Sequence, residues 1–435
     1  MGLKKVLVIS PYFPPSNAAD MQRIRMSLSY FREYGWEPEV VTVAPEYSEL
    51  PKDDLLLQSI PSDIKIHEVT ALNRRWSSKV GLGSLGLRAI LSYCKRVNKL
   101  LGQNHFDLVY FSTTQFPVCA LGAIWKKRYN VPYVVDMQDP WYTGSYYHDK
   151  PSSERPPKYR LMYALHKYLE RITMNHVGGL ISVSTDYLSD LAEQYPRLKT
   201  IPSTVITFGA FKIDLEIAKE NRQKFKPLLD PATINIVCAG RGGKDMHEAV
   251  AELFNALKLG LNAEYNIFSR IRLCFIGTSY APAGQGKPTI TPLAEYYGVS
   301  SSVVEITDRI AFYHTLWTLQ RADALFIPGS SDQKYTASKI YPYLLTGRPL
   351  LAIFHPQSPA VKTLKDYGVK HVFDYTSGST DKILNFLKDV IEGQAKPESY
   401  NKAIEEKYSA ENMTRLQCAL FEQTLTKNAA TDTSP

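Results

Sequence analysis

Four loops of this chain hold residue types that could bind an anion or transfer a proton. The first loop covers residues 14–20 and contains Asn17 and Asp20, and Arg23 follows in the next helical turn. Small residues at the start of a helix let a ligand approach the backbone, where N–H groups can bind its negative charge. The loop therefore predicts a ligand site, with a simple turn in which Asn17 or Asp20 caps the helix as the alternative.

The second loop, residues 136–141, follows an apolar strand and contains Asp139 and Trp141. A carboxylate placed just past a strand end could accept a proton from a hydroxyl group. The indole ring of Trp141 offers a flat apolar surface that suits a sugar. We therefore expect Asp139 to be catalytic, unless it only turns the chain before Pro140.

The third loop is rich in glycine and carries two cations, with the sequence Gly240-Arg241-Gly242-Gly243-Lys244. Glycines let a backbone approach a diphosphate, and Arg241 and Lys244 can neutralise its charge as it departs. The spacing differs from the GxxxxGK[ST] motif of ATP-binding loops, so an ATPase is not indicated. Solvated Arg and Lys side chains are the alternative.

The fourth loop contains Ser338 and Lys339 before a segment with helical character. Ser338 is placed to cap this helix, whose N-terminal amides would then form a second anion site. Helix starts are common, so this signal has weight only together with the glycine-rich loop. Asp245 and Glu248 also have the spacing of a capping box for the helix that follows that loop.

The strands that must position these loops form two series. Ligands of open α/β sheets bind at the carboxyl ends of parallel strands. In the first half, short apolar segments predict strands at residues 4–10, 39–43, 108–112, 133–136 and 179–182. In the second half, they predict strands at residues 234–239, 272–276, 303–306, 324–327 and 350–353. Helical stretches separate the strands, as in doubly wound parallel sheets.

The fold class expected from this pattern is α/β, with two Rossmann-like doubly wound domains. The length of 435 residues suits two domains. We expect an N-terminal domain at residues 1–205, a C-terminal domain at 206–410, a helix at 411–425 that crosses back to the first domain, and a disordered tail at 426–435. The linker is expected within residues 212–231.

Composition narrows the class of protein. The five cysteines form no CxxC pair and lie mostly in apolar segments, which indicates reduced core residues and a cytoplasmic location. No apolar stretch reaches the roughly 18 to 20 residues of a membrane-spanning helix. The net charge of +8 favours an anionic partner. Nucleic acid is not the expected partner, because the basic residues lack interleaved aromatics for base stacking.

A basic stretch between Glu68 and Asp107 suggests where an anionic membrane surface could bind. It contains no acidic residue and has a local charge of +7. Helical spacing from Leu87 separates an apolar face from a basic face, which could rest on lipid headgroups at about 1 kcal/mol per charge. The alternative is a solvated basic face. The membrane-contact residues expected here are Arg74, Arg75, Lys79, Arg88, Lys95 and Lys99.

Taken in order, these loops resemble the family 4 group of glycosyltransferases, which have the GT-B architecture of two Rossmann-like domains facing a cleft. The resemblance covers nearly the whole chain. It is carried by the segment VLVISPYFPPSNAADMQRIR near the N-terminus, by VPYVVDMQDPW, and by RADALFIPGSS and SKIYPYLLTGRPLLA in the second half.

The resemblance implies the roles of the two domains. The first would bind the acceptor, through Asn17, Asp20, Arg23 and Trp141. The second would bind a UDP- or GDP-sugar, through Gly240, Arg241, Lys244, Ser338 and Lys339. Such enzymes usually retain the anomeric configuration and need neither metal nor cofactor. We expect the acceptor to be a glycan or a lipid-linked molecule used in cell-surface glycan or polysaccharide synthesis. The lipid-linked form and a place at the inner membrane face are expected from the basic helix.

Three departures from the family pattern leave other functions open. Lys334 and Pro342 stand where the family has paired glutamates, Asn17-Ala18-Ala19 stands where it often has Gly-Gly, and Gln138 replaces a histidine. A noncatalytic nucleotide-sugar binder is one alternative function. A nucleotide-sugar epimerase of the same architecture is the other.

Overall fold

The computed structural model describes residues 2–141, 157–281, 283–333, 335, 339–376, 378–396 and 402–432. The chain divides into two compact units. Unit 1 comprises Met1–Gly209 and Ser409–Pro435, and unit 2 comprises Ala210–Tyr408. The chain enters unit 2 at residue 210, and residues 212–220 are a helix of that unit, within the stretch where the sequence predicts a linker.

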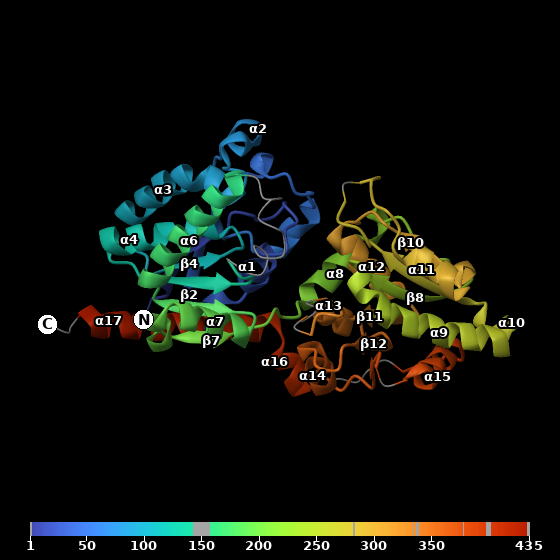
Figure 1. Cartoon of the computed structure of the whole chain (residues 1–435). Helices are drawn as coiled ribbons and strands as arrows, with labels where there is room; N and C mark the ends of the chain where they lie inside the picture. The colour runs from blue at the N-terminus through green and yellow to red at the C-terminus, as the bar shows by residue number, and fades with distance from the viewer. Residues whose placement is uncertain are drawn as a thin grey trace. The chain divides into compact units, whose positions relative to one another are not determined.

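Unit 1 is built on a parallel sheet with the strand order β3-β2-β1-β4-β5-β6-β7. Its strands are β1 Lys4–Ile9, β2 Trp36–Val43, β3 Lys65–Val69, β4 Leu108–Ser112, β5 Tyr133–Met137, β6 Gly179–Ser182 and β7 Ser203–Val205. The α-helices described in it are α1 Met21–Ser27, α2 Arg74–Ser77, α3 Leu85–Gln103, α4 Leu121–Tyr129, α6 Pro157–His176, α7 Thr185–Gln194 and α17 Ala410–Asp432 (Figure 1).

The central strands of unit 1 are apolar on both sides because helices cover both faces of the sheet. Every residue of β4 and β5 is buried. On one face, Tyr93 and Val97 of α3 and Trp125 of α4 join the core. This arrangement leaves the loops at the carboxyl ends of the strands free to carry polar residues.

The C-terminal helix α17 completes unit 1. The ring of Phe421 lies 5.2 Å from Trp36 and 5.0 Å from Tyr110, measured between centroids. The helix continues to Asp432, so helix occupies positions that the sequence analysis assigns to a disordered tail from residue 426. Ala429 and Ala430 have high helix propensity, which favours this continuation.

Unit 2 repeats the architecture with the strand order β10-β9-β8-β11-β12-β13, again all parallel. Its strands are β8 Ile234–Ala239, β9 Ile271–Ile276, β10 Val303–Ile306, β11 Ala324–Pro328, β12 Leu350–Phe354 and β13 His371–Asp374. Its described α-helices are α8 Lys212–Glu220, α9 His247–Ala263, α10 Tyr265–Phe268, α11 Ile290–Tyr297, α12 Phe312–Arg321, α13 Ile340–Leu345, α14 Pro359–Asp366, α15 Thr380–Ile391 and α16 Lys402–Lys407.

Helices α9 and α15 supply much of the core of unit 2. Leu253 and Phe254 of α9 and Phe386 of α15 are fully buried against the sheet.

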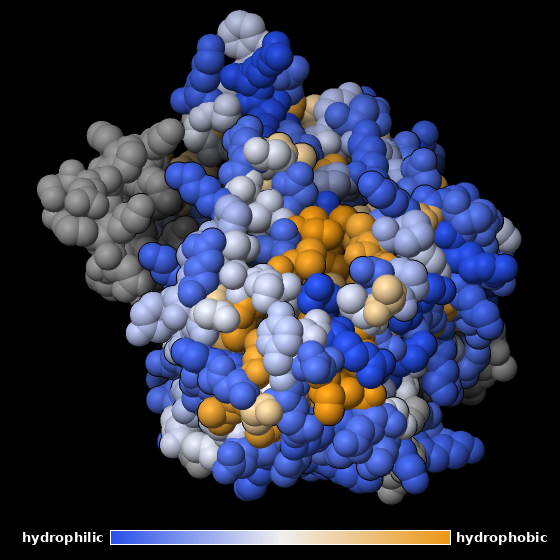
Figure 2. Space-filling view, turned by 90° about the vertical axis from the view of Figure 1, so that its right-hand side faces the viewer, coloured by the Kyte–Doolittle hydropathy of each residue, from blue (hydrophilic) through white to orange (hydrophobic). Residues whose placement is uncertain are grey.

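The face shown in Figure 2 is hydrophilic over most of its area, and hydrophobic residues gather around its centre. The α/β class and the two Rossmann-like sheets expected from the sequence are thus confirmed.

Candidate active site

The strand order of unit 1 reverses between β1 and β4, which is where open α/β sheets bind ligands. Three loops start near this point: residues 10–20 after β1, Thr113 and Thr114 after β4, and Gln138 and Asp139 after β5. The loops predicted from the sequence at residues 14–20 and 136–141 are therefore brought to one edge of one sheet.

Arg23 lies inside unit 1 and not at its surface. Its side chain is fully buried, and its Nε atom lies 2.6 Å from Oδ2 of Asp136. The guanidinium also donates to the carbonyl oxygens of Ile206 at 2.8 Å and Thr207 at 3.3 Å. Since every direction around it is occupied by protein, Arg23 does not fit the predicted role of acceptor binding. It instead holds α1 to β5 and to residues 206 and 207.

Asp20 is also buried and joins two loops. Its carboxylate accepts hydrogen bonds from the hydroxyl groups of Thr113 at 3.0 Å and Thr114 at 3.1 Å, and from the Thr114 N–H at 2.9 Å. Burial raises the pKa of Asp20, and these three donors oppose the shift. The carboxylate does not cap α1. Since Asp20 is buried and its Oδ2 atom binds the β4 loop, its surroundings suit a structural role better than the predicted contact with an acceptor.

Gln138 links the same groups from the end of β5. Its side-chain amide donates to Oδ2 of Asp136 at 2.8 Å, to the Asp20 carbonyl at 3.1 Å and to the Ser112 hydroxyl at 3.3 Å. Within the described part of the chain, Oδ1 of Asp136 is buried and has no hydrogen-bond partner. Burial raises the pKa of Asp136, and Arg23 acts in the opposite direction.

Asp139 differs from these buried groups because it is exposed. No hydrogen bond is formed by its carboxylate with any residue that the structure describes. Partial desolvation raises the pKa of Asp139, and the nearby charge of Asp20 adds to the effect. A carboxylate that is accessible and has a raised pKa suits proton transfer.

The other two predicted acceptor residues have different surroundings. Trp141 is buried and stacks on Phe116 at 5.4 Å between centroids, and its indole N–H donates to Nδ1 of His166 at 3.0 Å. Trp141 is thus a packing residue and not an open platform for a sugar. Asn17 is partly exposed, and its backbone N–H donates to the carbonyl of Pro51 at 2.8 Å. This leaves its side chain compatible with ligand binding.

The strand order of unit 2 reverses between β8 and β11, and the glycine-rich loop starts there. Gly240 has φ of +115°, a conformation that side-chain-bearing residues rarely adopt. A Cβ atom at this position would lie 3.9 Å from Nζ of Lys339. The backbone of Gly240 and the amino group of Lys339 are therefore close neighbours.

Arg241 is held by a carboxylate that the sequence analysis assigned to a helix cap. Its two terminal nitrogens lie 2.8 and 2.6 Å from the oxygens of Asp245. Asp245 also accepts from the Ser330 hydroxyl at 2.7 Å, and the N–H of Ser331 donates to its carbonyl at 2.7 Å. The predicted capping box is not formed, since α9 begins at His247 after Met246. Asp245 instead ties the β8 loop to the β11 loop.

Lys339 is the buried cation of this region, and it follows the loop after β11. Its Nζ atom is buried and makes no hydrogen bond with the described residues. Lys339 occupies the N-cap position of α13, which begins at Ile340. Ser338, expected to cap this helix, and Lys334 lie outside the described residues. A buried ammonium with unused donors is suited to an anion.

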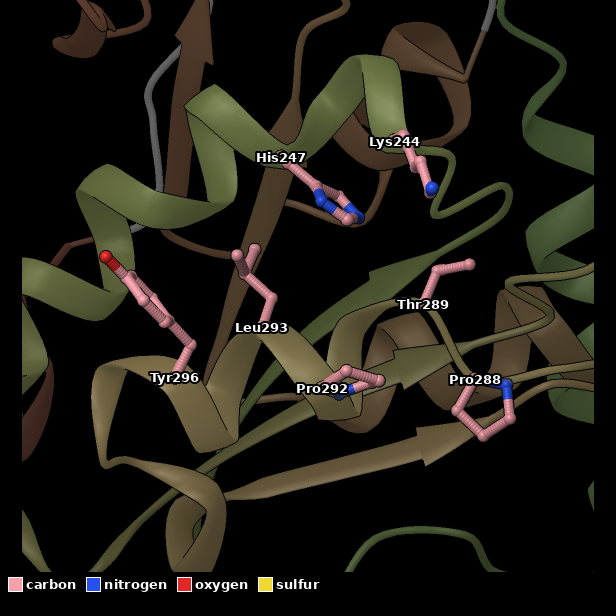
Figure 3. Close-up of a pocket in the computed structure, with 7 residues that line it drawn as sticks. All are labelled: Lys244, His247, Pro288, Thr289, Pro292, Leu293 and Tyr296. Carbon is pink, nitrogen blue, oxygen red and sulfur yellow. The ribbon is translucent and has the colours of Figure 1, made fainter.

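Lys244 lies at the edge of a pocket of about 300 Å³ in unit 2. Figure 3 shows Lys244 and His247 on one side of it, and Pro292, Leu293 and Tyr296 of α11 on the other. Nε2 of His247 is buried and has no hydrogen-bond partner among the described residues. Burial lowers the pKa of His247, and the charge of Lys244 lowers it further. The predicted donor residue Lys244 is thus exposed at the rim of a mostly apolar cavity.

The predicted membrane-contact residues separate into two groups. Arg74, Arg75, Lys79, Lys95 and Lys99 are exposed. Arg88 is buried, lies 2.8 Å from Glu49 and donates to the carbonyl of Tyr47, so it forms a structural ion pair and cannot contact lipid.

The described helices include none that is long and apolar enough to span a bilayer. The described residues also contain no metal-binding group of three or more His, Cys, Asp or Glu.

Comparisons with known proteins show which family model and which solved structures this chain resembles. Residues 22–203 match the family described as "Glycosyl transferase 4-like domain". A sucrose-phosphate synthase from Thermosynechococcus elongatus has a similar structure, with a TM-score of 0.59 and 12% identity over 98% of this chain and 100% of that one. This chain has the GT-B fold of glycosyltransferases. The resemblance expected from the sequence is thereby confirmed for the fold of the chain, and residues 22–203 match the glycosyl transferase domain.

Two further GT-B structures extend the comparison. An alpha,alpha-trehalose 6-phosphate synthase from Burkholderia multivorans has a TM-score of 0.59 and 12% identity, over 100% of this chain and 99% of that one. The Anabaena protein HepE, solved in complex with UDP-glucose, has a TM-score of 0.51 and 16% identity, over 98% and 99% of the two chains. No curated protein matches the sequence significantly.

The sequence analysis did not identify Asp245, Ser330 and Asp136 as residues that hold the loops at the two switch points in place. The position of Asp245 four residues after Arg241 was the available signal, since opposite charges at this spacing often pair. Asp136 and Ser330 gave no local signal, because their partners lie 113 and 85 residues away in the sequence.

Proposed function

We propose that this protein transfers a sugar from a nucleotide-diphosphate sugar to an acceptor hydroxyl group. The observation that carries the proposal is the set of cations beside Gly240, where Arg241 is held by Asp245 and Nζ of Lys339 has no partner among the described residues. Such a set can bind a diphosphate, and it stabilises the charge that grows as the diphosphate leaves. The solved UDP-glucose complex of HepE supports a nucleotide-sugar donor of this type.

In the proposed reaction, the loops of unit 2 bind the donor, and the loops of unit 1 bind and activate the acceptor. Lys339, Lys244 and the free N–H groups of Arg241 hold the donor diphosphate in unit 2. Asp139 accepts the proton of the acceptor hydroxyl, because it is an exposed carboxylate that follows β5, close to the switch point of unit 1. Asn17 contributes to acceptor binding. Asp20, Arg23 and Gln138 keep the loops that carry Asn17 and Asp139 in place.

The finer parts of the proposal concern donor, stereochemistry and pathway. We propose a UDP- or GDP-sugar donor and retention of anomeric configuration. The acceptor would be a glycan or lipid-linked molecule of cell-surface polysaccharide synthesis, used in the cytoplasm at the inner membrane face. Resolving the anomeric configuration of the product by NMR tests retention, and an inverted product would contradict it.

Nucleotide binding is the first test. A ligand at about 100 times its dissociation constant adds about 2.7 kcal/mol to the free energy of unfolding. We expect UDP or GDP to raise the melting temperature, and Arg241→Ala and Lys339→Ala to make this rise clearly smaller. The control Lys258→Ala removes an exposed cation of α9 and should keep it. If no nucleoside diphosphate stabilises the protein, the proposal fails.

Catalysis requires a second test. Asp139→Asn should leave nucleotide stabilisation unchanged and lower transfer or donor hydrolysis by about 10²- to 10⁴-fold. Equal turnover in the variant would remove Asp139 from the mechanism.

A noncatalytic nucleotide-sugar binder is the second candidate function. Pro342 lies within α13 at a position where the resembled family has a glutamate, and Lys334 is at the other such position. Neither carboxylate is available to hold the donor sugar. Binding of a nucleotide sugar without turnover, for every donor and acceptor tested, would favour this function.

A further inference from the structure

An exposed apolar and basic surface lies at the tip of unit 1 that contains α2. Trp76 is 73% exposed and Leu72 is 50% exposed, which is unusual for side chains of this size. They alternate with the exposed cations Arg74, Arg75 and Lys79. We call Leu72, Arg74, Arg75, Trp76 and Lys79 the α2 tip, which projects from the unit in Figure 1.

The α2 tip is an ordered part of the fold. The Asn73 side chain caps α2 by accepting from the N–H of Arg75 at 2.9 Å, and the N–H of Leu72 donates to the carbonyl of Arg88 at 3.0 Å. The turn after α2 ends at Gly81, where a Cβ would lie 2.9 Å from Sδ of Met162 on α6. The tip is therefore held against both α3 and α6, and its apolar side chains are presented outward.

The cations of the tip are not neutralised by carboxylates of the described residues. None of Arg74, Arg75 and Lys79 forms an ion pair with the described residues, while Nζ of Lys79 lies 5.0 Å from the centre of the Trp76 ring. On α3, Lys95 and Lys99 are exposed at four-residue spacing and follow Leu91, which is also exposed. Residues 69–106 contain no carboxylate that could neutralise them.

We propose that the α2 tip binds an anionic lipid bilayer, with Trp76 and Leu72 inserted at the level of the headgroups. Tryptophan prefers the membrane interface because its ring is apolar and its N–H is polar. Basic residues beside it are attracted to anionic lipid. This surface deepens the proposed membrane location and does not depend on the transfer chemistry. Compared with the membrane-contact residues expected from the sequence, the α2 tip omits the buried Arg88 and adds the apolar side chains of Leu72 and Trp76.

Tryptophan fluorescence measures the insertion directly. Of the five tryptophans, Trp36, Trp125 and Trp141 are buried and Trp317 is partly buried, so Trp76 is the exposed reporter. The full chain is mixed with phosphatidylcholine vesicles, with or without phosphatidylglycerol. We expect sedimentation with the anionic vesicles only, a blue shift of the emission, and release by salt.

Two variants separate charge from insertion. Arg74→Glu/Arg75→Glu/Lys79→Glu should weaken vesicle binding at least about a hundredfold, because each charge near the surface contributes about a factor of five. The control Lys127→Glu/Lys258→Glu/Lys382→Glu changes the net charge equally, at exposed positions elsewhere, and should bind nearly normally. Leu72→Ser/Trp76→Ser should lose most of its sedimentation with anionic vesicles, whereas Leu259→Ser/Tyr265→Ser in unit 2 should keep it.

Several results would overturn the proposal. These are equal binding to neutral vesicles, equal weakening by the control triple variant, or binding of a DNA duplex through the same residues in place of vesicles. Nucleotide stabilisation is measured on every variant. If it persists while vesicle binding is absent, the α2 tip proposal fails and the proposed transfer function stands.

Discussion

The two units have the same topology at their switch points, but the charged side chains there differ in whether the fold itself binds them. In unit 1, Arg23, Asp20 and Asp136 are buried. Arg23 pairs with Asp136, and Asp20 binds the loop after β4. In unit 2, Lys339 is unpartnered among the described residues and Lys244 is exposed. A ligand site needs donors that the fold itself does not consume. We therefore propose that the charges at the switch point of unit 1 stabilise the fold and that Lys339 and Lys244 of unit 2 bind the ligand.

The largest effect should come from breaking the buried pair of unit 1. Arg23→Ala leaves Asp136 buried without its cation, which we expect to cost about 3–5 kcal/mol in the free energy of unfolding. Urea unfolding followed by tryptophan fluorescence measures this cost. Lys402→Ala, which breaks an exposed pair with Glu406, should cost less than about 1 kcal/mol. Similar costs for the two variants would contradict the structural role of Arg23.

A pH-dependent effect should follow from another buried carboxylate of unit 1. Glu170 accepts from the Tyr195 hydroxyl at 2.9 Å, and burial raises its pKa to about 7. Between its ordinary pKa of 4.5 and 7, the folded state binds a proton that the unfolded state has lost. The wild-type protein should therefore lose stability as pH rises through this range.

Glu170→Gln removes this titration. The variant should gain up to about 3 kcal/mol over the wild type between about pH 5 and about pH 8. Urea unfolding at both pH values provides the measurement. Glu193→Gln, an exposed neighbour on α7, serves as the control and should show no such gain. A constant difference between wild type and Glu170→Gln would show that Glu170 does not titrate as described.

A smaller effect, on binding and not on folding, is expected in unit 2. Lys339→Ala should weaken nucleoside diphosphate binding by about 10- to 100-fold, since a hydrogen bond to a charged group contributes about 1.5–3 kcal/mol. Its free energy of unfolding without nucleotide should not fall, because Nζ of the lysine has no partner in the part of the chain that the structure describes. Isothermal titration calorimetry with UDP and GDP measures the affinity. Unfolding at a lower urea concentration would mean that Lys339 is structural.

The smallest effect on stability is expected for Asp139→Asn. An accessible carboxylate without a hydrogen bond contributes little, so the free energy of unfolding should change by less than about 0.5 kcal/mol. The same urea experiment tests this. A loss comparable with that of Arg23→Ala would place Asp139 among the structural charges of unit 1.

The central strands were predictable from the sequence because they are buried on both faces and read as apolar runs. The predicted segments at 108–112, 179–182 and 234–239 coincide with β4, β6 and β8. The edge strands β3, β7 and β13 were missed, since a strand at the edge of a sheet can remain polar. The sequence KIHEV of β3 shows no apolar run.

The roles of individual side chains were less predictable than the loops that carry them. Residue type indicated that Arg23 and Trp141 could bind a ligand, but their partners Asp136 and Phe116 decide otherwise. Such partners become visible only when the strands are ordered in space. Gly240, Arg241 and Lys339 kept their expected neighbourhood because they lie on loops at one switch point.

The return of the chain to unit 1 has a consequence for protein synthesis. Helix α17 places Phe421 against Trp36 and Tyr110, and a Cβ at Gly179 would lie 2.4 Å from the hydroxyl oxygen of Thr424. During translation, unit 2 is a continuous segment that can fold as soon as residue 408 has left the ribosome. Unit 1 must wait for the last helix, with the apolar surface around Trp36 uncovered until then. The half of the molecule that is made first is therefore the half that is finished last.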